Sequence, residues 1–441
     1  MDRKPVTTFG FLLCFLAACS SPGAADAAVH YVSPVGQAAW SACANVNTPC
    51  SWQTAMTNAA AGDTVYFRGG SYDPGASCPS TWEYVAMTPR NSGTAADPIT
   101  FKAYPGETPV ILACPPYTAA NPSNMVTPAF GARDVSYIIW DGFSSTMIDG
   151  PGEMWLFLYW NSKGSKVRNC NFTGVNHLNE HPNAAPVRIE QSSDNEVSNN
   201  FIHGMNGGTN TGAIWIFASA RVKVHHNTIA NGANGIMQKT GPNVDNEIYN
   251  NFLYSLTMDG IRYYDEVAGS GDKAYQNVIV SANFAIDGMP GSGATQTNLQ
   301  IFNNTIYGAK AGIGVGDYAR SAQVWNNIIY NTGNTAAYVR YYPGLSLPSY
   351  SDYNDFSGSG GKWSLGYQTD YPSLASWRSA MGFDGSSTTT DPQFVKPGGA
   401  NASDYRRKSY PPNGKGGSVM GAYMTGSESI GCLPPPANLR R

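Results

Sequence analysis

One short pattern recurs along the middle of the chain and constrains the fold more than any other feature. An apolar residue, mostly Val or Ile, is followed three positions later by a turn residue, as in Glu247-Ile-Tyr-Asn-Asn and Gln300-Ile-Phe-Asn-Asn. Successive turn residues are 23 to 30 positions apart, a period typical of a solenoid whose coils contact only their neighbours. The turn position is held by Gly142, Cys170, Asn200, Asn227, Asn251, Asn277, Asn304 and Asn327, with Asn354 as a further candidate.

The coils are predicted to consist of β-strands. Val and Ile alternate with polar residues around each turn, so the apolar side chains point to one face of the strand. Charged residues make up only 13% of the chain, and Gly (48) and Tyr (26) are abundant, which suits stacked strands better than helices. A stacked Asn amide can bond to the amides above and below it and to the bending backbone. We therefore predict a parallel β-helix, because the hairpin signals of a β-propeller are absent.

The remaining segments are predicted to close the two ends of this solenoid. We expect one domain over 29–425, with an N-terminal cap and first coils at 29–130, regular coils at 131–357, a C-terminal cap at 358–425 and a tail at 426–441. A short helix begins after Ser51, a plausible N-cap, and a surface helix is expected near 371–382. The first helix and its strands resemble the N-terminal cap of right-handed parallel β-helix proteins. The predicted fold class is therefore all-β, a single-stranded right-handed parallel β-helix of the pectate-lyase type, with a capping helix and a C-terminal cap.

The N-terminus is predicted to be an export signal. A positively charged start precedes a mostly apolar run over 6–18, which is too short for a membrane span. The sequence around Cys19 resembles a bacterial lipobox, which implies that Cys19 is lipidated; the alternative is ordinary cleavage near 25–28. We expect an outer-membrane lipoprotein or a periplasmic or extracellular protein, in contact with membrane only through a lipid anchor.

Cysteine usage fits an oxidising compartment. Cys43 and Cys50 are seven positions apart and are expected to form a local disulfide, and Cys78 and Cys114 are the next pair. Cys170 occupies a turn position and is interpreted as a small core residue.

A second strand family, about ten residues after each turn, concentrates the chemistry. If its leading Ile or Val points inward, the first and third residues after it point outward. Aromatic and basic groups on one face suit an acidic polysaccharide, whereas a plain ion-pair ladder is the structural alternative. The net charge of −3 offers no basic footprint for nucleic acid, and we expect a monomer. The outward candidates for substrate binding are Arg188, Glu190, Trp215, Phe217, Asp287, Arg340 and Tyr342, next to Lys239, Arg262 and Tyr264.

Two residues on adjacent coils resemble a known family. Lys239-Thr-Gly and Gly260-Ile-Arg262 look similar to the catalytic Lys and Arg of chondroitinase B and alginate lyase type polysaccharide lyases, which are right-handed parallel β-helices. The resemblance implies β-elimination on a uronic acid, with Lys239 as general base and Arg262 holding the carboxylate. Tyr264 would protonate the leaving oxygen, and Arg262 is expected to lower the pKa of Lys239.

Calcium is the cofactor that this resemblance suggests. In that family acidic calcium ligands precede the Lys, whereas residues 235–238 of this chain contain none. Asn234 and Glu190 are the remaining candidates for a cation ligand. The loop residues His177, Glu180 and His181 could also hold a metal, although loop residues of this kind usually do not.

Two other functions stay open at this point. An inverting glycoside hydrolase needs two carboxylates separated enough to admit a water. A non-catalytic glycan-binding or structural β-helix is the other alternative, because fold alone does not settle function. The carboxylate candidates for a hydrolase are Glu190, Asp265, Asp287 and Asp317.

Overall fold

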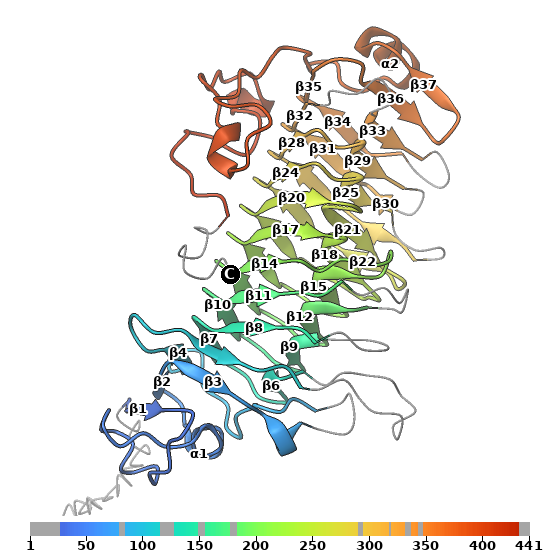
Figure 1. Ribbon diagram of the computed structural model, residues 1–441. Coiled ribbons are helices and arrows are strands. Elements are labelled where there is room, and N and C mark those ends of the chain that lie inside the picture. The colour runs from blue at the N-terminus through green and yellow to red at the C-terminus, as the bar shows by residue number, and fades with distance from the viewer. Residues whose placement is uncertain are drawn as a thin grey trace, which may run out of the picture.

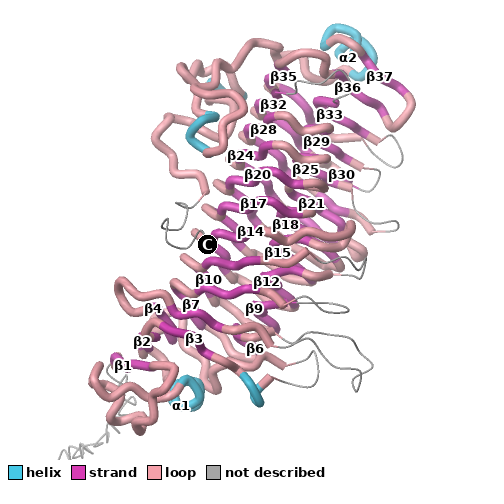
Figure 2. Tube along the Cα trace, viewed as in Figure 1, coloured by secondary structure: helices cyan, strands magenta, loops and turns pink. Residues whose placement is uncertain are grey.

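The computed structural model describes residues 27–78, 84–114, 128–148, 155–176, 183–289, 294–316, 319–330, 337–342 and 347–431. They form an elongated parallel β-helix (Figure 1) in which helices lie at the ends and in the C-terminal segment (Figure 2). Each regular coil contributes one strand to each of three large sheets, here named A, B and C. Among the named strands of these sheets, neighbours pair in parallel except β36 and β37, which form an antiparallel hairpin. The predicted parallel β-helix is confirmed.

The strands are short, as expected for coils that bend three times. Sheet A contains β1 (Val29–Val32), β2 (Thr64–Phe67), β4 (Ile99–Ala103), β7 (Ile138–Asp141), β10 (Lys166–Arg168), β13 (Glu196–Ser198), β16 (Lys223–His225), β19 (Glu247–Tyr249), β23 (Lys273–Tyr275), β27 (Gln300–Phe302), β31 (Gln323–Trp325) and β34 (Tyr350–Asp352). Sheet B contains β3 (Gly70–Tyr72), β5 (Pro109–Ile111), β8 (Ser144–Thr146), β11 (Asn171–Thr173), β14 (Phe201–His203), β17 (Thr228–Gly232), β20 (Phe252–Leu256), β24 (Val278–Val280), β28 (Thr305–Tyr307), β32 (Ile328–Tyr330) and β35 (Asp355–Ser357).

Sheet C carries the candidate site and has the longest strands. It contains β6 (Phe130–Arg133), β9 (Trp155–Trp160), β12 (Ala185–Glu190), β15 (Gly212–Phe217), β18 (Asn234–Lys239), β21 (Ile261–Tyr264), β25 (Phe284–Gly288), β29 (Ala311–Val315), β33 (Ala337–Tyr341), β36 (Lys362–Leu365) and β37 (Thr369–Tyr371). A small sheet follows sheet C in the middle coils and contains β22 (Gly269–Ser270), β26 (Gln296–Thr297) and β30 (Ala319–Arg320).

An asparagine ladder fixes the turn between sheets A and B. From Asn200 to Asn327, each buried side-chain amide donates from Nδ2 to the Oδ1 of the next rung at 3.0–3.1 Å. That Oδ1 also accepts the backbone N–H of the rung before it. Asn354 receives the last rung, so the series continues as the spacing indicated. The residue before each rung from Cys170 to Asn327 has a φ of 53–56°, a left-handed conformation that Asn tolerates better than most residues, which accounts for the repeated Asn-Asn pairs.

The bore is filled by inward side chains from all three sheets. In one coil, Val224, Ile229 and Ile236 come from sheets A, B and C and belong to one buried cluster. Cys170 lies at the start of the ladder, and burial raises the pKa of its thiol to about 12. Its interpretation as a core residue is confirmed.

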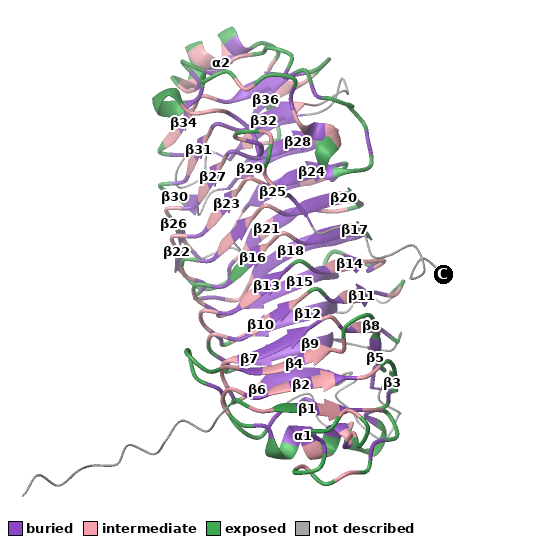
Figure 3. Cartoon of the chain, turned by 90° about the vertical axis from the view of Figure 1, so that its left-hand side faces the viewer, coloured by how far each residue is buried: buried purple, intermediate pink, exposed green. Residues whose placement is uncertain are grey.

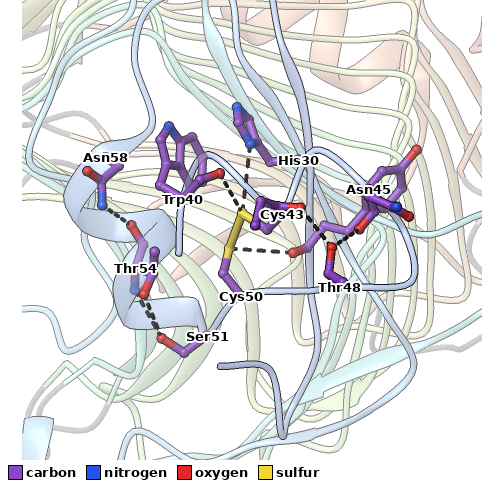
Figure 4. The surroundings of a disulfide bond; sticks show 11 residues. His30, Trp40, Cys43, Asn45, Thr48, Cys50, Ser51, Thr54 and Asn58 are labelled. Carbon is purple, nitrogen blue, oxygen red and sulfur yellow. Dashed lines mark hydrogen bonds between the residues drawn. A yellow bond between two sulfur atoms is a disulfide. The ribbon is translucent and has the colours of Figure 1, made fainter. Parts of the chain in front are cut away.

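The N-terminal end is capped as the sequence predicted. Helix α1 (Trp52–Asn58) begins after Ser51, whose hydroxyl accepts the backbone N–H of Thr54 at 3.2 Å. Cys43 and Cys50 form a disulfide beside this helix (Figure 4), with a Cα–Cα distance of 5.3 Å. Cys78 and Cys114 form the second predicted disulfide. The 3₁₀ turn η1 (Gly75–Ser77) precedes Cys78.

The C-terminal segment covers both an end and a side of the solenoid. Helix α2 (Leu374–Met381) buries Trp377, which donates to Asp384 at 2.8 Å. The chain then runs back along sheet B through the 3₁₀ turns η2 (Ala402–Tyr405) and η3 (Lys415–Gly417). The expected tail from 426 onward packs here as far as Gly431, whose N–H donates to the Asn250 carbonyl at 2.9 Å. No helix among the described residues is long and apolar enough to cross a membrane.

Candidate functional site

The strand register of sheet C arranges its outward side chains in two columns. The first column runs through Arg188, Trp215, Met237, Arg262, Asp287, Gly314 and Arg340. The second column runs through Glu190, Phe217, Lys239 and Tyr264. The alternate residues, such as Ile214 and Ile236, belong to the bore. The predicted side-chain directions therefore agree with the structure.

Outward-facing residues in the first half of this face are nevertheless buried. Trp215 is 0% exposed and packs with Ala185, Phe217 and Met237 in a cluster separate from the bore. The rings of Trp215 and Phe217 stack at 5.4 Å. The expectation that Trp215 and Phe217 flank an open groove is wrong, because large side chains on adjacent coils cover one another. Figure 3 shows the strands of sheet C as buried over much of their length.

Arg188 and Glu190 are bound to each other. The Arg188 Nε donates to a Glu190 carboxylate oxygen at 2.6 Å. The Arg188 guanidinium also lies between two rings, 4.1 Å from the Trp155 centroid and 3.9 Å from the Phe217 centroid. A cation held by a carboxylate and two rings is part of the packing. For Arg188 and Glu190, a structural ion pair therefore explains the contacts better than a substrate-binding site does.

Lys239 lies where the buried cluster ends. Its Nζ is 3.3 Å from the Asn183 Oδ1, 3.5 Å from the Asn210 Oδ1 and 3.9 Å from the Glu266 Oε1, and its side chain is 12% exposed. The two Asn residues precede β12 and β15 on the two preceding coils, and sequence reasoning missed both. They occupy equivalent positions two residues before these strands, and the Asn183 N–H donates to the Asn210 carbonyl at 2.9 Å.

Tyr264 links Lys239 to Arg262. Its ring centroid is 5.9 Å from the Lys239 Nζ and 4.8 Å from the Arg262 guanidinium carbon. Lys239 pairs in register with Tyr264, whereas Arg262 pairs with Met237, so the two cations lie diagonally across the ring. The structure thus brings the three predicted catalytic residues together.

Two buried carboxyl groups hold Arg262 from the other side. Its NH1 is 3.5 Å from the Asp259 Oδ2, and its Nε is 3.5 Å from the Asp287 Oδ2. Burial and the Asp259 charge raise the pKa of Asp287 to about 8 against the opposing effect of Arg262, and burial also raises the pKa of Asp259. Asp287 is therefore mostly protonated at neutral pH, so the charge of Arg262 is opposed by one carboxylate, Asp259, instead of two.

Asp259 is a third site residue that was not among the candidates from the sequence. It precedes Gly260-Ile261 as Asn234 precedes Gly235-Ile236, and its backbone N–H donates to the Asn234 Oδ1 at 3.2 Å. Comparison of these two repeats was the available signal.

Asp265 is not on this face. Its carboxylate points into the corner of the bore and accepts hydrogen bonds from Asn243 at 2.6 Å and Gln238 at 3.1 Å. Gln238 also donates to Asp272 at 2.6 Å. Burial raises the pKa of Asp265 to about 6 and that of Asp272 to about 7. Asp265 is thereby excluded from a surface carboxylate pair, and Asp317 lies outside the described residues.

The candidate cation ligands do not converge. Asn234 uses its amide to donate to the Thr209 and Thr211 carbonyls at 2.9 and 2.8 Å, and Glu190 is bound to Arg188. Asn234 lies five residues, about 16 Å, from the strand position in register with the Glu190 column. Asn234 and Glu190 therefore do not fit one calcium ion. Among the described residues, no group of three or more His, Cys, Asp or Glu could hold a metal; His177, Glu180 and His181 lie outside them.

Comparisons with known proteins agree with the fold. A family model described as "Right handed beta helix region" matches residues 155–289. No curated protein matches the sequence. The chain is similar to the crystal structure of pectate lyase Pel9A, with 14% identity, a TM-score of 0.53 and coverage of 91% of this chain and 97% of that one.

Two further similar structures are also titled as lyases. A mannuronic acid specific family 6 polysaccharide lyase from human gut microbiota has 14% identity, a TM-score of 0.46 and coverage of 77% of each chain. A rhamnogalacturonan lyase has 12% identity, a TM-score of 0.47 and coverage of 94% of this chain and 98% of its own. The family model and the similarity to pectate lyase Pel9A confirm the right-handed β-helix, and the activity has to be argued from the site.

Proposed function

We propose that this protein is a polysaccharide lyase that cleaves an acidic, uronate-containing polysaccharide by β-elimination. This proposal is based on the position of Lys239 and Arg262, which both lie next to the phenol ring of Tyr264. β-Elimination needs a base for a carbon-bound proton, a cation for the neighbouring carboxylate and an acid for the leaving oxygen. The three side chains supply one of each.

The proposed reaction begins with binding of the uronate carboxylate to Arg262. Neutralising this carboxylate makes the C5 proton more acidic and stabilises the enolate-like intermediate. Lys239, in its neutral form, accepts the C5 proton; the electron pair of the C5–H bond forms the C4–C5 double bond as the C4–O bond breaks. Tyr264 gives its proton to the leaving oxygen. Proton exchange with water then returns Lys239 and Tyr264 to their starting states.

Asp287 and Asp259 support the role of Arg262 in this scheme. Two ionised carboxylates would make this group net negative and would repel a uronate, but the pKa of Asp287 is raised to about 8 by burial and by Asp259. Arg262 is therefore positioned by both groups, while only Asp259 opposes its charge at neutral pH.

A glycoside hydrolase is the second candidate function. The pair Asp259 and Asp287 favours it, because a carboxyl group with a raised pKa can act as a general acid beside an ionised partner. Both groups are buried behind Arg262, which makes access of a glycosidic oxygen to them poor. A non-catalytic glycan-binding protein is the remaining alternative.

We also propose that the protein is exported and anchored through a lipid on Cys19. The apolar run over 6–18 and the lipobox-like sequence support this proposal, and Cys19 lies outside the described residues. We expect a fatty acid analogue to label the protein in cells, and we expect this labelling to be lost in the Cys19→Ser variant. Unchanged labelling in that variant would contradict it.

One assay separates the three functions. The purified protein is incubated with alginate, pectate, chondroitin and bacterial exopolysaccharides. Unsaturated products that absorb in the ultraviolet identify a lyase, and new reducing ends without that absorbance identify a hydrolase. Binding without either product identifies a binding protein.

Variants test the assignment of the three residues. Lys239→Ala is expected to abolish product formation, and Tyr264→Phe, which keeps the ring and removes only the hydroxyl, to lower kcat about 10²-fold or more. Lys223→Ala is the control, because this exposed Lys lies on sheet A. Intact lyase activity in Lys239→Ala would refute the assignment.

A further inference from the structure

A second group of polar and aromatic side chains lies further along the outward face of sheet C. Arg340 occupies the same column as Arg262, three coils away through Asp287 and Gly314. At about 4.8 Å per coil, the two guanidinium-bearing positions are about 14 Å apart. Tyr342 follows on the same side of the strand, and Tyr367 lies in the turn between β36 and β37.

Polar atoms of this group are buried and are incompletely hydrogen-bonded. Among the described residues, the Arg340 Nε and the Tyr342 hydroxyl make no hydrogen bond of normal geometry; the Tyr342 hydroxyl interacts with the side chains of Arg340 and Tyr367, and Tyr342 is 8% exposed. Within the described part of the chain Arg340 forms no ion pair, since the neighbouring Asp370 is bound to Lys362 at 2.5 Å and to Ser364 at 2.7 Å. An unsatisfied buried donor costs about 1–3 kcal/mol, so the arrangement is best satisfied by a bound acceptor.

An exposed ring stands directly beside these atoms. Tyr367 is 76% exposed, its ring lies 5.0 Å from that of Tyr342, and its centroid is 5.6 Å from the Arg340 guanidinium. This exposed ring offers an apolar face to a sugar ring next to a cation.

The Phe284 ring covers the position between Asp287 and Arg340. Gly314 separates Asp287 from Arg340, and a Cβ there would lie 3.1 Å from the Phe284 ring and 3.3 Å from the Asp287 Oδ1. The same ring lies 5.7 Å from the Arg340 guanidinium. An extended chain that passes from Arg262 to Arg340 would therefore run over the Phe284 ring.

We propose that Arg340, Tyr342 and Tyr367 form a second sugar subsite, which binds a carboxylate-bearing sugar of the glycan whose reacting unit is held by Arg262. Arg340 binds the carboxylate, the Tyr342 hydroxyl donates to a sugar oxygen and Tyr367 stacks on the ring. The inference rests on the proposed function for the identity of the first sugar. It specifies the substrate class as a polymer with carboxylates on several units along one chain, bound parallel to the solenoid axis.

Direct binding tests this subsite in the Lys239→Ala background, where the ligand cannot be cleaved. Isothermal titration with acidic hexasaccharides from alginate, pectate and chondroitin is compared with cellohexaose, which carries no carboxylate. Arg340→Ala is expected to weaken binding of the preferred acidic hexasaccharide about tenfold to a hundredfold, the range for a hydrogen bond to a charged group. Tyr367→Ala, at an exposed position where folding is not at stake, is expected to weaken it severalfold.

Controls separate this inference from the proposed function. Arg320→Ala removes an exposed Arg of the small sheet and should leave affinity unchanged. The subsite would be overturned if Arg340→Ala and Tyr367→Ala bound the acidic hexasaccharide as tightly as their parent does. It would also be overturned if no acidic hexasaccharide bound. If no polymer is cleaved by the wild type but binding still depends on Arg340, the lyase proposal fails and the subsite stands.

Discussion

Asn277→Ala removes one rung from the middle of the asparagine ladder and tests what holds the solenoid together. The Asn277 Nδ2 donates to the Asn304 Oδ1 at 3.0 Å and to the Ile248 carbonyl at 2.9 Å. Its Oδ1 accepts the Asn251 backbone N–H at 3.1 Å and the Asn251 side-chain amide at 3.0 Å. Alanine at this position removes all four bonds.

The four losses are unequal. The Asn251 side-chain amide keeps its bonds to the Val224 and Tyr249 carbonyls, and the Asn304 Oδ1 keeps the backbone N–H of residue 277. The backbone N–H of Asn251 loses its side-chain acceptor and stays buried, at a cost of about 1–3 kcal/mol; each of the other three bonds contributes about 0.5–1.5 kcal/mol. We expect the free energy of unfolding to fall by about 3–7 kcal/mol.

Urea unfolding followed by circular dichroism measures this loss. Cys170→Ala is the matched control at the first ladder position, because the Cys170 side chain donates only to the Arg168 carbonyl, at 3.2 Å. Its loss should be less than half of that for Asn277→Ala. Equal losses, or a loss below 1 kcal/mol for Asn277→Ala, would show that the repeated Asn serves the turn conformation rather than a continuous hydrogen-bonded ladder.

Three further predictions concern sheet C and the bore. Burial raises the pKa of Asp272 from 3.8 to about 7; the contribution of Asp272 to stability should therefore be fully present below about pH 4 and fall by about 4 kcal/mol as the pH rises to 7, and urea unfolding of Asp272→Asn should lack this part of the slope. In the lyase assay, kcat/KM should fall above about pH 8 as Asp287 ionises against Arg262, and Asp287→Asn should lose that limb; an unchanged limb would contradict the role given to Asp287. Trp215→Ala should lower the free energy of unfolding by about 3–5 kcal/mol, whereas a change in glycan affinity alone would show that Trp215 is accessible after all.

The sequence was sufficient to predict the fold because each coil makes the same interactions with its neighbours. Asn251, Asn277 and Asn304 each need the same neighbours, so one motif read many times specifies turn, register and direction together. Side-chain direction on sheet C was predictable for the same reason, since Ile214 and Ile236 alternate with Trp215 and Met237. The two disulfides followed from spacing and from the small number of cysteines.

Exposure on that outward face was not predictable. Alternation states that Trp215 and Lys239 leave the bore, but whether they reach solvent depends on the size of their neighbours on adjacent coils. Asn183 and Asn210 reach Lys239 from the segments just before β12 and β15, outside the alternating strand positions, and Asp265 turns inward at a strand end where alternation stops being a guide. The carboxyl groups around Arg262 required three-dimensional proximity that spacing alone does not give.

The ion-pair ladder and the binding site, which the sequence left as alternatives, occupy different parts of one face. Up to Phe217 the outward side chains pack against one another. Arg188 contacts Glu190 and two aromatic rings, so its charge is compensated within the packing. Beyond Phe217 the cations are less completely paired, since Arg262 faces two carboxyl groups of which one is mostly protonated, and Arg340 forms no ion pair within the described residues, where the neighbouring Asp370 is bound to Lys362. A polyanionic chain could contact both Arg residues along one line of this face, so Phe217 marks where structural packing ends and the proposed binding surface begins.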